Sequence, residues 1–197
     1  MNGWPETMAK TSASIFRKEL AQIAEELRRS IEADVSGFDA DPQAIQQRVA
    51  RSNGDFQFFA ETYFPHYLTG PASVLHRYLF KILPQMVDEE SGQRHAIAAP
   101  RGEAKSTIAT RIFTLWCVLT GRKKYIPIIM DAMDQAVVML DSIKAELEVN
   151  PRLKSDYPDQ VGEGRVWKEG VVITKGDAKV QAFGSGKRKR GFPVLFP

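Results

Sequence analysis

A lysine followed by two hydroxyl residues ends the stretch AAPRGEAKST at positions 98–107. These side chains are the ones that a phosphate-binding loop needs. The lysine reaches the terminal phosphates of a nucleotide, and the hydroxyl after it helps to hold Mg²⁺ at the start of a helix. The stretch therefore predicts a site for ATP and Mg²⁺, with Ser106 as the hydroxyl on the magnesium side. The residues expected to contact the nucleotide are Pro100, Arg101, Gly102, Glu103, Ala104, Lys105, Ser106 and Thr107.

The loop departs from the usual pattern at its glycines. The standard pattern places glycine at two positions that hold Ala99 and Ala104 here. Alanine adopts left-handed backbone conformations poorly, so the loop is expected to close only if position 104 does not need a positive φ. Gly102 compensates in part. The alternative is that Lys105 merely begins an amphipathic helix and binds no phosphate.

Arg101 lies inside the loop, four residues before the lysine. A bulky cation has little structural use at such a position. A guanidinium there can lie along phosphates and stabilise the charge that develops during phosphoryl transfer. We therefore predict that Arg101 is a catalytic residue.

The surrounding elements are expected to follow the order strand, loop, helix that a phosphate loop requires. The short apolar run at 95–99 predicts the strand, and residues 105–119 predict the helix. A second strand at 124–130 and a second helix at 132–149 follow. Two such units in succession imply an α/β fold with a parallel sheet and right-handed crossovers.

Beyond the second helix the chain is less regular. Two extended segments at 170–174 and 178–183 predict a hairpin that leads into the basic tetrad KRKR at 187–190. The tetrad either contacts phosphates or is solvated surface. Pro127 removes a ladder donor from the second strand, which is therefore expected to be bulged or peripheral.

The chain before the loop is expected to be helical. Apolar spacing predicts an amphipathic helix at about 14–33 and a shorter helix at 43–50. We interpret residues 1–53 as an appendage that docks on the later domain, residues 54–197, or on a partner protein. The aromatic run at 56–67 is expected to pack in the core, and a further helix is expected at 72–87.

Charge and composition limit the class of protein. Residues 1–50 carry 6 basic against 8 acidic side chains and the rest carry 21 against 16, so polyanion contact is expected from the later part. No run approaches the roughly 20 apolar residues of a membrane span, which indicates a soluble, intracellular protein. The single cysteine, Cys117, lies in an apolar run and is expected to be a buried small hydrophobe.

The sequence between about residues 55 and 191 resembles the ATPase domain of the large terminase subunit of tailed bacteriophages. The segments that carry the resemblance are APRGEAKST, KKYIPIIMD, DQAVVMLDSIKAELEVNPRLKSDYP, VWKEG and QAFGSGKRKRG, in this order. Members of that family carry a Walker A loop with an arginine, which Arg101 and Lys105 match. The resemblance implies a P-loop ATPase that drives double-stranded DNA into a capsid in the cytoplasm of a bacterial host cell. It also implies a small terminase subunit and a portal protein as partners, and a homo-oligomeric full-length motor.

The resemblance assigns two further site residues. Arg190 and Gly191 match the arginine–glycine pair of the family, which implies that Arg190 senses charge or couples hydrolysis to movement. The family often places a glutamine near the adenine, and His76 occupies that polar position in LHRYLF.

The chain departs from the family after Gly191. The family has an apolar strand there that ends in adjacent acidic residues and is called Walker B. In this chain the sequence at that place is FPVLFP. We therefore expect the sheet to be incomplete and the isolated chain to hydrolyse ATP poorly. Asp131 ends an apolar run and is followed by Asp134, but its strand directly follows the helix of the loop, so we do not favour it as a substitute. The acids at 88–90 are expected to be solvated surface.

Two other functions fit parts of the sequence. One is a non-catalytic prophage remnant or interaction module that binds terminase partners or DNA without ATP turnover. The other is a helicase-like P-loop ATPase, which the loop allows and the AFGSGKRKRG segment disfavours.

Overall fold

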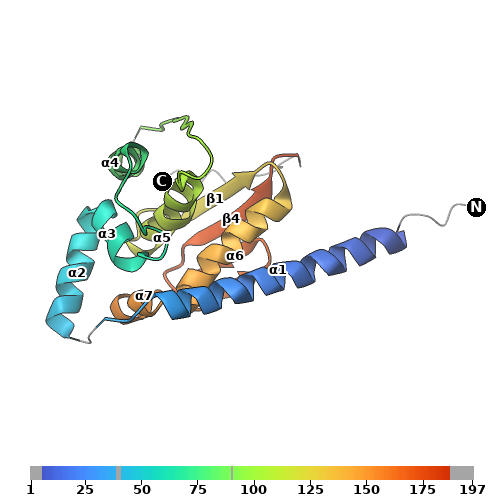
Figure 1. The fold of residues 1–197 in the computed structure, drawn as a ribbon, viewed down its shortest axis with the longest axis horizontal. Coiled ribbons are helices and arrows are strands. Elements are labelled where there is room, and N and C mark those ends of the chain that lie inside the picture. Colours follow the sequence, from blue (N-terminus) through green and yellow to red (C-terminus); the bar gives the residue numbers. More distant parts are fainter. Residues whose placement is uncertain (1–5, 39–40, 90, 187–197) are drawn as a thin grey trace, which may run out of the picture.

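The structure, a computed structural model, describes residues 6–38, 41–89 and 91–186, with only the backbone of residues 6–17. Helices pack around a four-stranded sheet (Figure 1). The elements are α1 (Glu6–Asp34), α2 (Pro42–Gly54), α3 (Phe56–Tyr63), α4 (Val74–Asp88), the π-helix η1 (Thr107–Ile112), α5 (Phe113–Leu119), β1 (Tyr125–Met130), α6 (Met133–Val149), α7 (Pro151–Asp156), β2 (Val166–Lys168), β3 (Val171–Ile173) and β4 (Lys179–Gly184).

The sheet has the strand order β1-β4-β3-β2. β1 and β4 run parallel, whereas β4 with β3 and β3 with β2 are antiparallel. The α/β class and the predicted hairpin, which β3 and β4 form, are confirmed. The expected parallel sheet is wrong for the pairings of β2 with β3 and of β3 with β4. Tight turns join these strands, and such turns allow only antiparallel pairing.

The predicted strand at 95–99 is also wrong. Residues 92–100 form no strand and are largely exposed. A strand needs a neighbour that accepts its backbone hydrogen bonds, and here the Ile97 carbonyl instead accepts a hydrogen bond from the side chain of Lys105. Among the described strands β1 pairs only with β4, so it forms an edge of the sheet. The exposed Pro127 lies on this edge strand, as expected for a peripheral strand.

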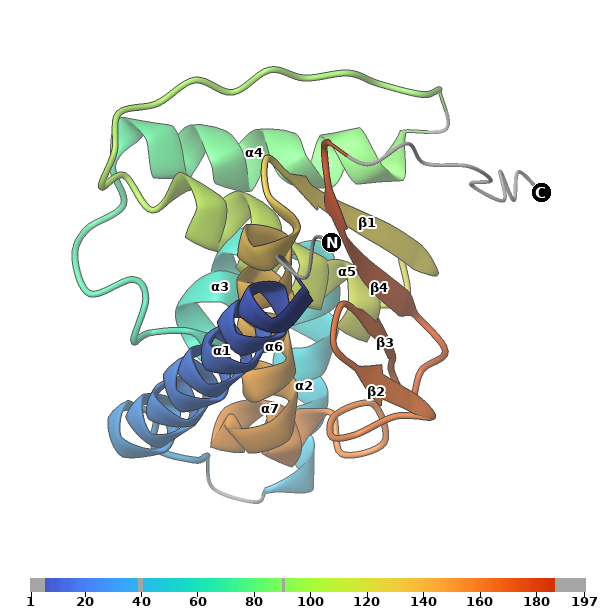
Figure 2. The same cartoon turned by 90° about the vertical axis from the view of Figure 1, so that its right-hand side faces the viewer.

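Helix α6 covers one face of the sheet, and α1 lies across α6 (Figure 2). The packing buries alternate strand residues, among them Ile128, Val180 and Ala182, against the apolar side of α6. Gly184 allows the closest approach, because a Cβ at this position would lie 2.7 Å from the backbone nitrogen of Met133. The end of β4 therefore sits directly against the first turn of α6.

The N-terminal helices pack on the rest of the chain, so the described part of the appendage docks on the later domain. Ile31 of α1 is fully buried with Ala145 of α6. The Arg28 guanidinium donates to the Glu148 carboxylate at 2.6 Å. Helix α2 begins at Pro42 behind the Asp41 side chain, which accepts hydrogen bonds from two backbone N–H groups of its first turn.

Helix α5 is buried from Thr114 to Leu119. It contains Cys117, which is 2% exposed, and burial raises the pKa of its thiol to about 12. The expectation of a buried small hydrophobe is therefore confirmed. Across the described ranges, no helix is both long enough and apolar enough to cross a membrane.

Candidate phosphate-binding loop

The eight loop residues expected to contact a nucleotide lie around one open cavity of about 580 Å³. Ala99 also lines it. A helical conformation begins at Lys105, and the Ile108 N–H donates to the Ala104 carbonyl at 2.9 Å. The loop thus ends at a helix N-terminus, where backbone N–H groups favour a bound anion.

Two loop residues have a positive φ, 90° at Gly102 and 49° at Ala104. Ala104 therefore adopts the left-handed conformation at the position where the standard pattern has glycine. An L-residue in this conformation costs on the order of 1–2 kcal/mol relative to a right-handed one. The condition set by the sequence, that position 104 should not need a positive φ, is not met. The loop nevertheless adopts this turn, with backbone strain at Ala104.

The side chains predicted to bind phosphate surround the cavity. The Lys105 ammonium donates to the Ile97 carbonyl at 3.3 Å. Ser106 and Arg101 are exposed and Thr107 is half-buried. A single neutral carbonyl at this distance is a weak partner for an ammonium, so a phosphate group can compete for Lys105.

The loop continues into a π-helical turn, η1, which the sequence did not predict. Ile108 and Ile112 of this turn are fully buried. Arg111 donates from Nε to the Ser142 hydroxyl at 2.8 Å and lies 4.7 Å from the centre of the Tyr67 ring. The first contact fixes the base of the loop to α6, and the second fixes it to the segment after α3. Single π turns often lie at functional sites.

His76 lies beside the loop. Its Nε2 is 3.1 Å from the carbonyl oxygen of Glu103. A carbonyl can only accept, so Nε2 carries the hydrogen. The helix that holds His76 begins at Val74, and the hydroxyl of its N-cap residue Ser73 accepts a hydrogen bond from the His76 backbone N–H at 3.3 Å. The predicted contact between His76 and adenine stays a prediction.

The remaining candidates lie elsewhere. Arg190 and the rest of the basic tetrad lie outside the described residues. The Ser185 N–H donates to the Met130 carbonyl at 2.8 Å, which joins the ends of the two parallel strands. Asp131 and Asp134 are both exposed, and Asp88 pairs with Arg122 at 3.0 Å. Within the ranges that the structure describes, no three His, Cys, Asp or Glu side chains form a group that could hold a metal ion.

A buried polar network joins α6 to the segment after α3. The Glu146 carboxylate is fully buried and lies 2.9 Å from Nε2 of His66. The Asn150 amide donates to the same carboxylate at 2.8 Å and to the Tyr63 carbonyl at 2.9 Å. No local pattern predicts this network, because Tyr63 and His66 lie 80 or more positions from Glu146 and Asn150 along the chain. Its hydrogen bonds satisfy the buried carboxylate and fix the position of α6.

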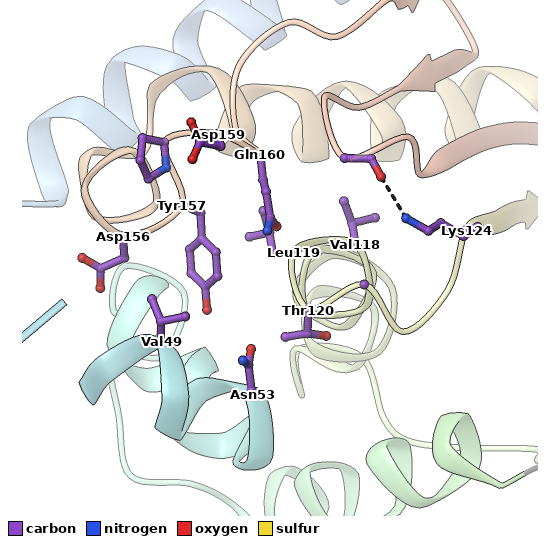
Figure 3. Close-up of a pocket in the computed structure, with 13 residues that line it drawn as sticks. Val49, Asn53, Val118, Leu119, Thr120, Lys124, Asp156, Tyr157, Asp159 and Gln160 are labelled. Atoms are coloured by element: carbon purple, nitrogen blue, oxygen red, sulfur yellow. Dashed lines mark hydrogen bonds between the residues drawn. The ribbon is translucent and has the colours of Figure 1, made fainter. Parts of the chain in front are cut away.

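A second cavity, of about 490 Å³, lies between α2, the end of α5 and the segment after α7 (Figure 3). Tyr157 projects into it, and burial raises the pKa of its hydroxyl to about 12. At its rim the Lys124 ammonium donates to the Gly176 carbonyl at 3.1 Å. No residue of the phosphate loop lines this cavity. It is therefore distinct from the candidate nucleotide site.

Comparisons of this chain with protein-family models, with curated proteins and with solved structures found no match.

Proposed function

We propose that this chain is the ATP-binding part of a large terminase subunit, the motor that packages double-stranded viral DNA into capsids. The observation that carries the proposal is the backbone of residues 99–107. It has positive φ values at Gly102 and Ala104, it runs into a helix at Lys105, and its residues are the described ones that line the cavity. This arrangement supports a phosphate loop, even though alanine stands at both glycine positions of the standard pattern.

The donors around the cavity fit a polyphosphate. The Lys105 ammonium would pair with the terminal phosphates, and the Arg101 guanidinium would lie along them. The Ser106 hydroxyl would be a ligand of the magnesium ion. Magnesium bound to the phosphates neutralises charge that develops during transfer. Because Ser106 supplies one oxygen, most magnesium ligands would come from the nucleotide and water.

The proposal includes partners and a place of action. By resemblance, the motor works in the cytoplasm of a bacterial host with a small terminase subunit, a portal protein and double-stranded DNA. The basic tetrad at 187–190 is the segment of this chain proposed to meet DNA phosphates. P-loop chemistry also needs a carboxylate that orients the attacking water, and among the described residues that line the cavity only Glu103 carries one. We therefore expect this chain to bind ATP and to turn it over slowly.

Titration of the purified chain with MgATP, by calorimetry, tests the site. We expect measurable binding that weakens at least about tenfold in Lys105→Ala, since a hydrogen bond to a charged group contributes roughly 1.5–3 kcal/mol. Lys81→Ala, which removes an exposed lysine from α4, is the matched control and should bind as the wild type does. Equal affinity in Lys105→Ala and the wild type would refute the site.

A release assay for inorganic phosphate separates the terminase proposal from the non-catalytic module. Slow MgATP turnover that stops in Lys105→Ala supports an ATPase. Tight binding of a terminase partner or of DNA by a chain that neither binds nor hydrolyses MgATP would favour the interaction module instead.

A further inference from the structure

The His76 side chain, on α4, forms a hydrogen bond with the loop backbone between its two positive-φ residues. Its Nε2 donates to the Glu103 carbonyl, which lies between Gly102 and Ala104. The contact spans 27 positions of sequence, from the first turn of α4 to the loop. It therefore fixes the loop to α4, a helix that is separate from the loop in the sequence.

The histidine itself is held firmly. The first turn of α4 is capped by Ser73, and the helix is anchored by Leu79 and Leu83, which are 0% and 3% exposed. Because His76 lies on the same helix, its ring presents Nε2 from a fixed backbone. A donor on this packed helix can therefore hold the Glu103 carbonyl in one orientation.

The bonded carbonyl belongs to the peptide unit that precedes Ala104. In a trans peptide the C=O and the following N–H point in opposite directions. A hydrogen bond that holds the Glu103 carbonyl toward α4 therefore directs the Ala104 N–H away from α4. It also restrains the φ angle of Ala104, which is the strained angle of the loop.

We infer that His76 is a positioning residue that holds the phosphate loop in its closed conformation through the Glu103 carbonyl. The effect of His76 on nucleotide binding rests on the proposed function. Its effect on the loop conformation rests on the hydrogen bond alone. With its Nε2 donating to the loop, His76 acts on the phosphates indirectly by keeping the loop ready for them. Both the neutral Nε2–H tautomer and the imidazolium can perform this role.

Two variants separate the donor from the bulk of the ring. His76→Gln keeps an N–H donor close to the position of Nε2, whereas His76→Leu removes the donor and retains an apolar side chain. The matched control is His95→Leu, which changes an exposed histidine that contacts Gln93. Limited digestion with trypsin reports on the loop directly, because Arg101 is exposed within it.

Cleavage after Arg101 is measured relative to cleavage after Arg165, an exposed site near β2. The loss of one hydrogen bond should raise this ratio in His76→Leu by about 3- to 10-fold. His76→Gln and His95→Leu should stay near the wild-type ratio. Global destabilisation would raise both cleavages together and leave the ratio unchanged. An unchanged ratio in His76→Leu would overturn the inference.

MgATP titration then tests the consequence for binding. His76→Leu should bind MgATP about 3- to 10-fold more weakly than the wild type, and His76→Gln should recover most of the affinity. Unchanged affinity in His76→Leu would refute the role of His76 in nucleotide binding. If the wild type binds no MgATP, the proposed function fails, and the cleavage ratio alone still decides whether His76 holds the loop.

Discussion

The Lys105 ammonium lies 3.3 Å from the carbonyl oxygen of Ile97, a residue that precedes the loop. The side chain of the lysine proposed to bind phosphate is thus hydrogen-bonded to a backbone carbonyl eight residues earlier. The contact is long and has a neutral acceptor, so it contributes little to folding. A hydrogen bond from this ammonium to a phosphate oxygen would be shorter and charge-assisted.

Lys105→Ala should therefore separate binding from folding. We expect its free energy of unfolding to change by less than about 1 kcal/mol, the contribution of one weak hydrogen bond. Urea denaturation followed by circular dichroism measures this quantity. A larger loss of stability would show that Lys105 is a structural residue, and weak MgATP binding by the variant could then not be assigned to a lost phosphate contact.

Ala104→Gly should stabilise the chain. Relief of the left-handed alanine is worth about 1–2 kcal/mol, and the extra freedom of glycine in the unfolded chain removes about 0.5–1 kcal/mol of this gain. A net increase of about 0.5–1 kcal/mol in the free energy of unfolding is expected. Urea denaturation of Ala104→Gly and the wild type provides the comparison.

The control for this variant is Ala99→Gly, at the other position where the standard pattern has glycine. Ala99 has no positive φ. Glycine there should leave the stability unchanged or lower it slightly, because only the unfolded chain gains freedom. Equal losses of stability in Ala99→Gly and Ala104→Gly would contradict the strain assigned to Ala104.

The elements with strong local patterns were the ones that the sequence predicted. Helix α6 has apolar residues at helical spacing, and the hairpin of β3 and β4 has short extended runs around the Gly176 turn. The signals for the loop are likewise local to one short stretch, whereas nucleotide binding by its residues stays a prediction. Local signals sufficed in these cases since each element forms largely from its own residues.

The remaining features depend on contacts between distant segments. Whether residues 95–99 pair as a strand depends on a neighbouring strand, and no local signal reports the hydrogen bond from His76 to Glu103. The π turn and the positive φ of Ala104 also follow from how the loop is packed. Helix α7 is different, because its Asn150 cap and the Pro151 after it are a start signal that is local to the sequence.

Asp156 gives the chain a pH-dependent contribution to stability. Its carboxylate accepts two hydrogen bonds from Arg48, at 2.7 and 2.8 Å, and one from Tyr63 at 2.7 Å. Burial favours a higher pKa for this carboxyl, but the hydrogen bonds from Arg48, Tyr63 and Ser155 outweigh burial and lower the pKa. The contribution is thus fully present above the unfolded pKa of about 3.9, and it is lost as the pH falls through the folded value.

Asp156→Asn should lower the free energy of unfolding at pH 7 by about 3 kcal/mol, since it leaves the mostly buried Arg48 without its partner. Below about pH 4, the stability of the variant should also fall less steeply than that of the wild type, because the folded carboxyl pKa lies below the unfolded value. Urea denaturation at pH 7 and at a series of pH values below about 4 measures both effects. Asp159→Asn changes an exposed carboxylate in the next segment and should behave as the wild type does, within about 0.5 kcal/mol. Parallel pH profiles of Asp156→Asn and the wild type would contradict the assignment.

Ile129 is half exposed on β1, an edge strand of the sheet. Exposed apolar edge strands promote pairing between molecules, and a lysine on such a strand opposes it. Ile129→Lys should therefore raise the fraction of monomer, measured by light scattering coupled to size-exclusion chromatography over a range of concentrations. Gln85→Lys adds the same charge to α4, away from the sheet, and separates the effect of net charge from that of the edge. If Gln85→Lys raises the monomer fraction as much as Ile129→Lys does, the charge and not the edge controls self-association.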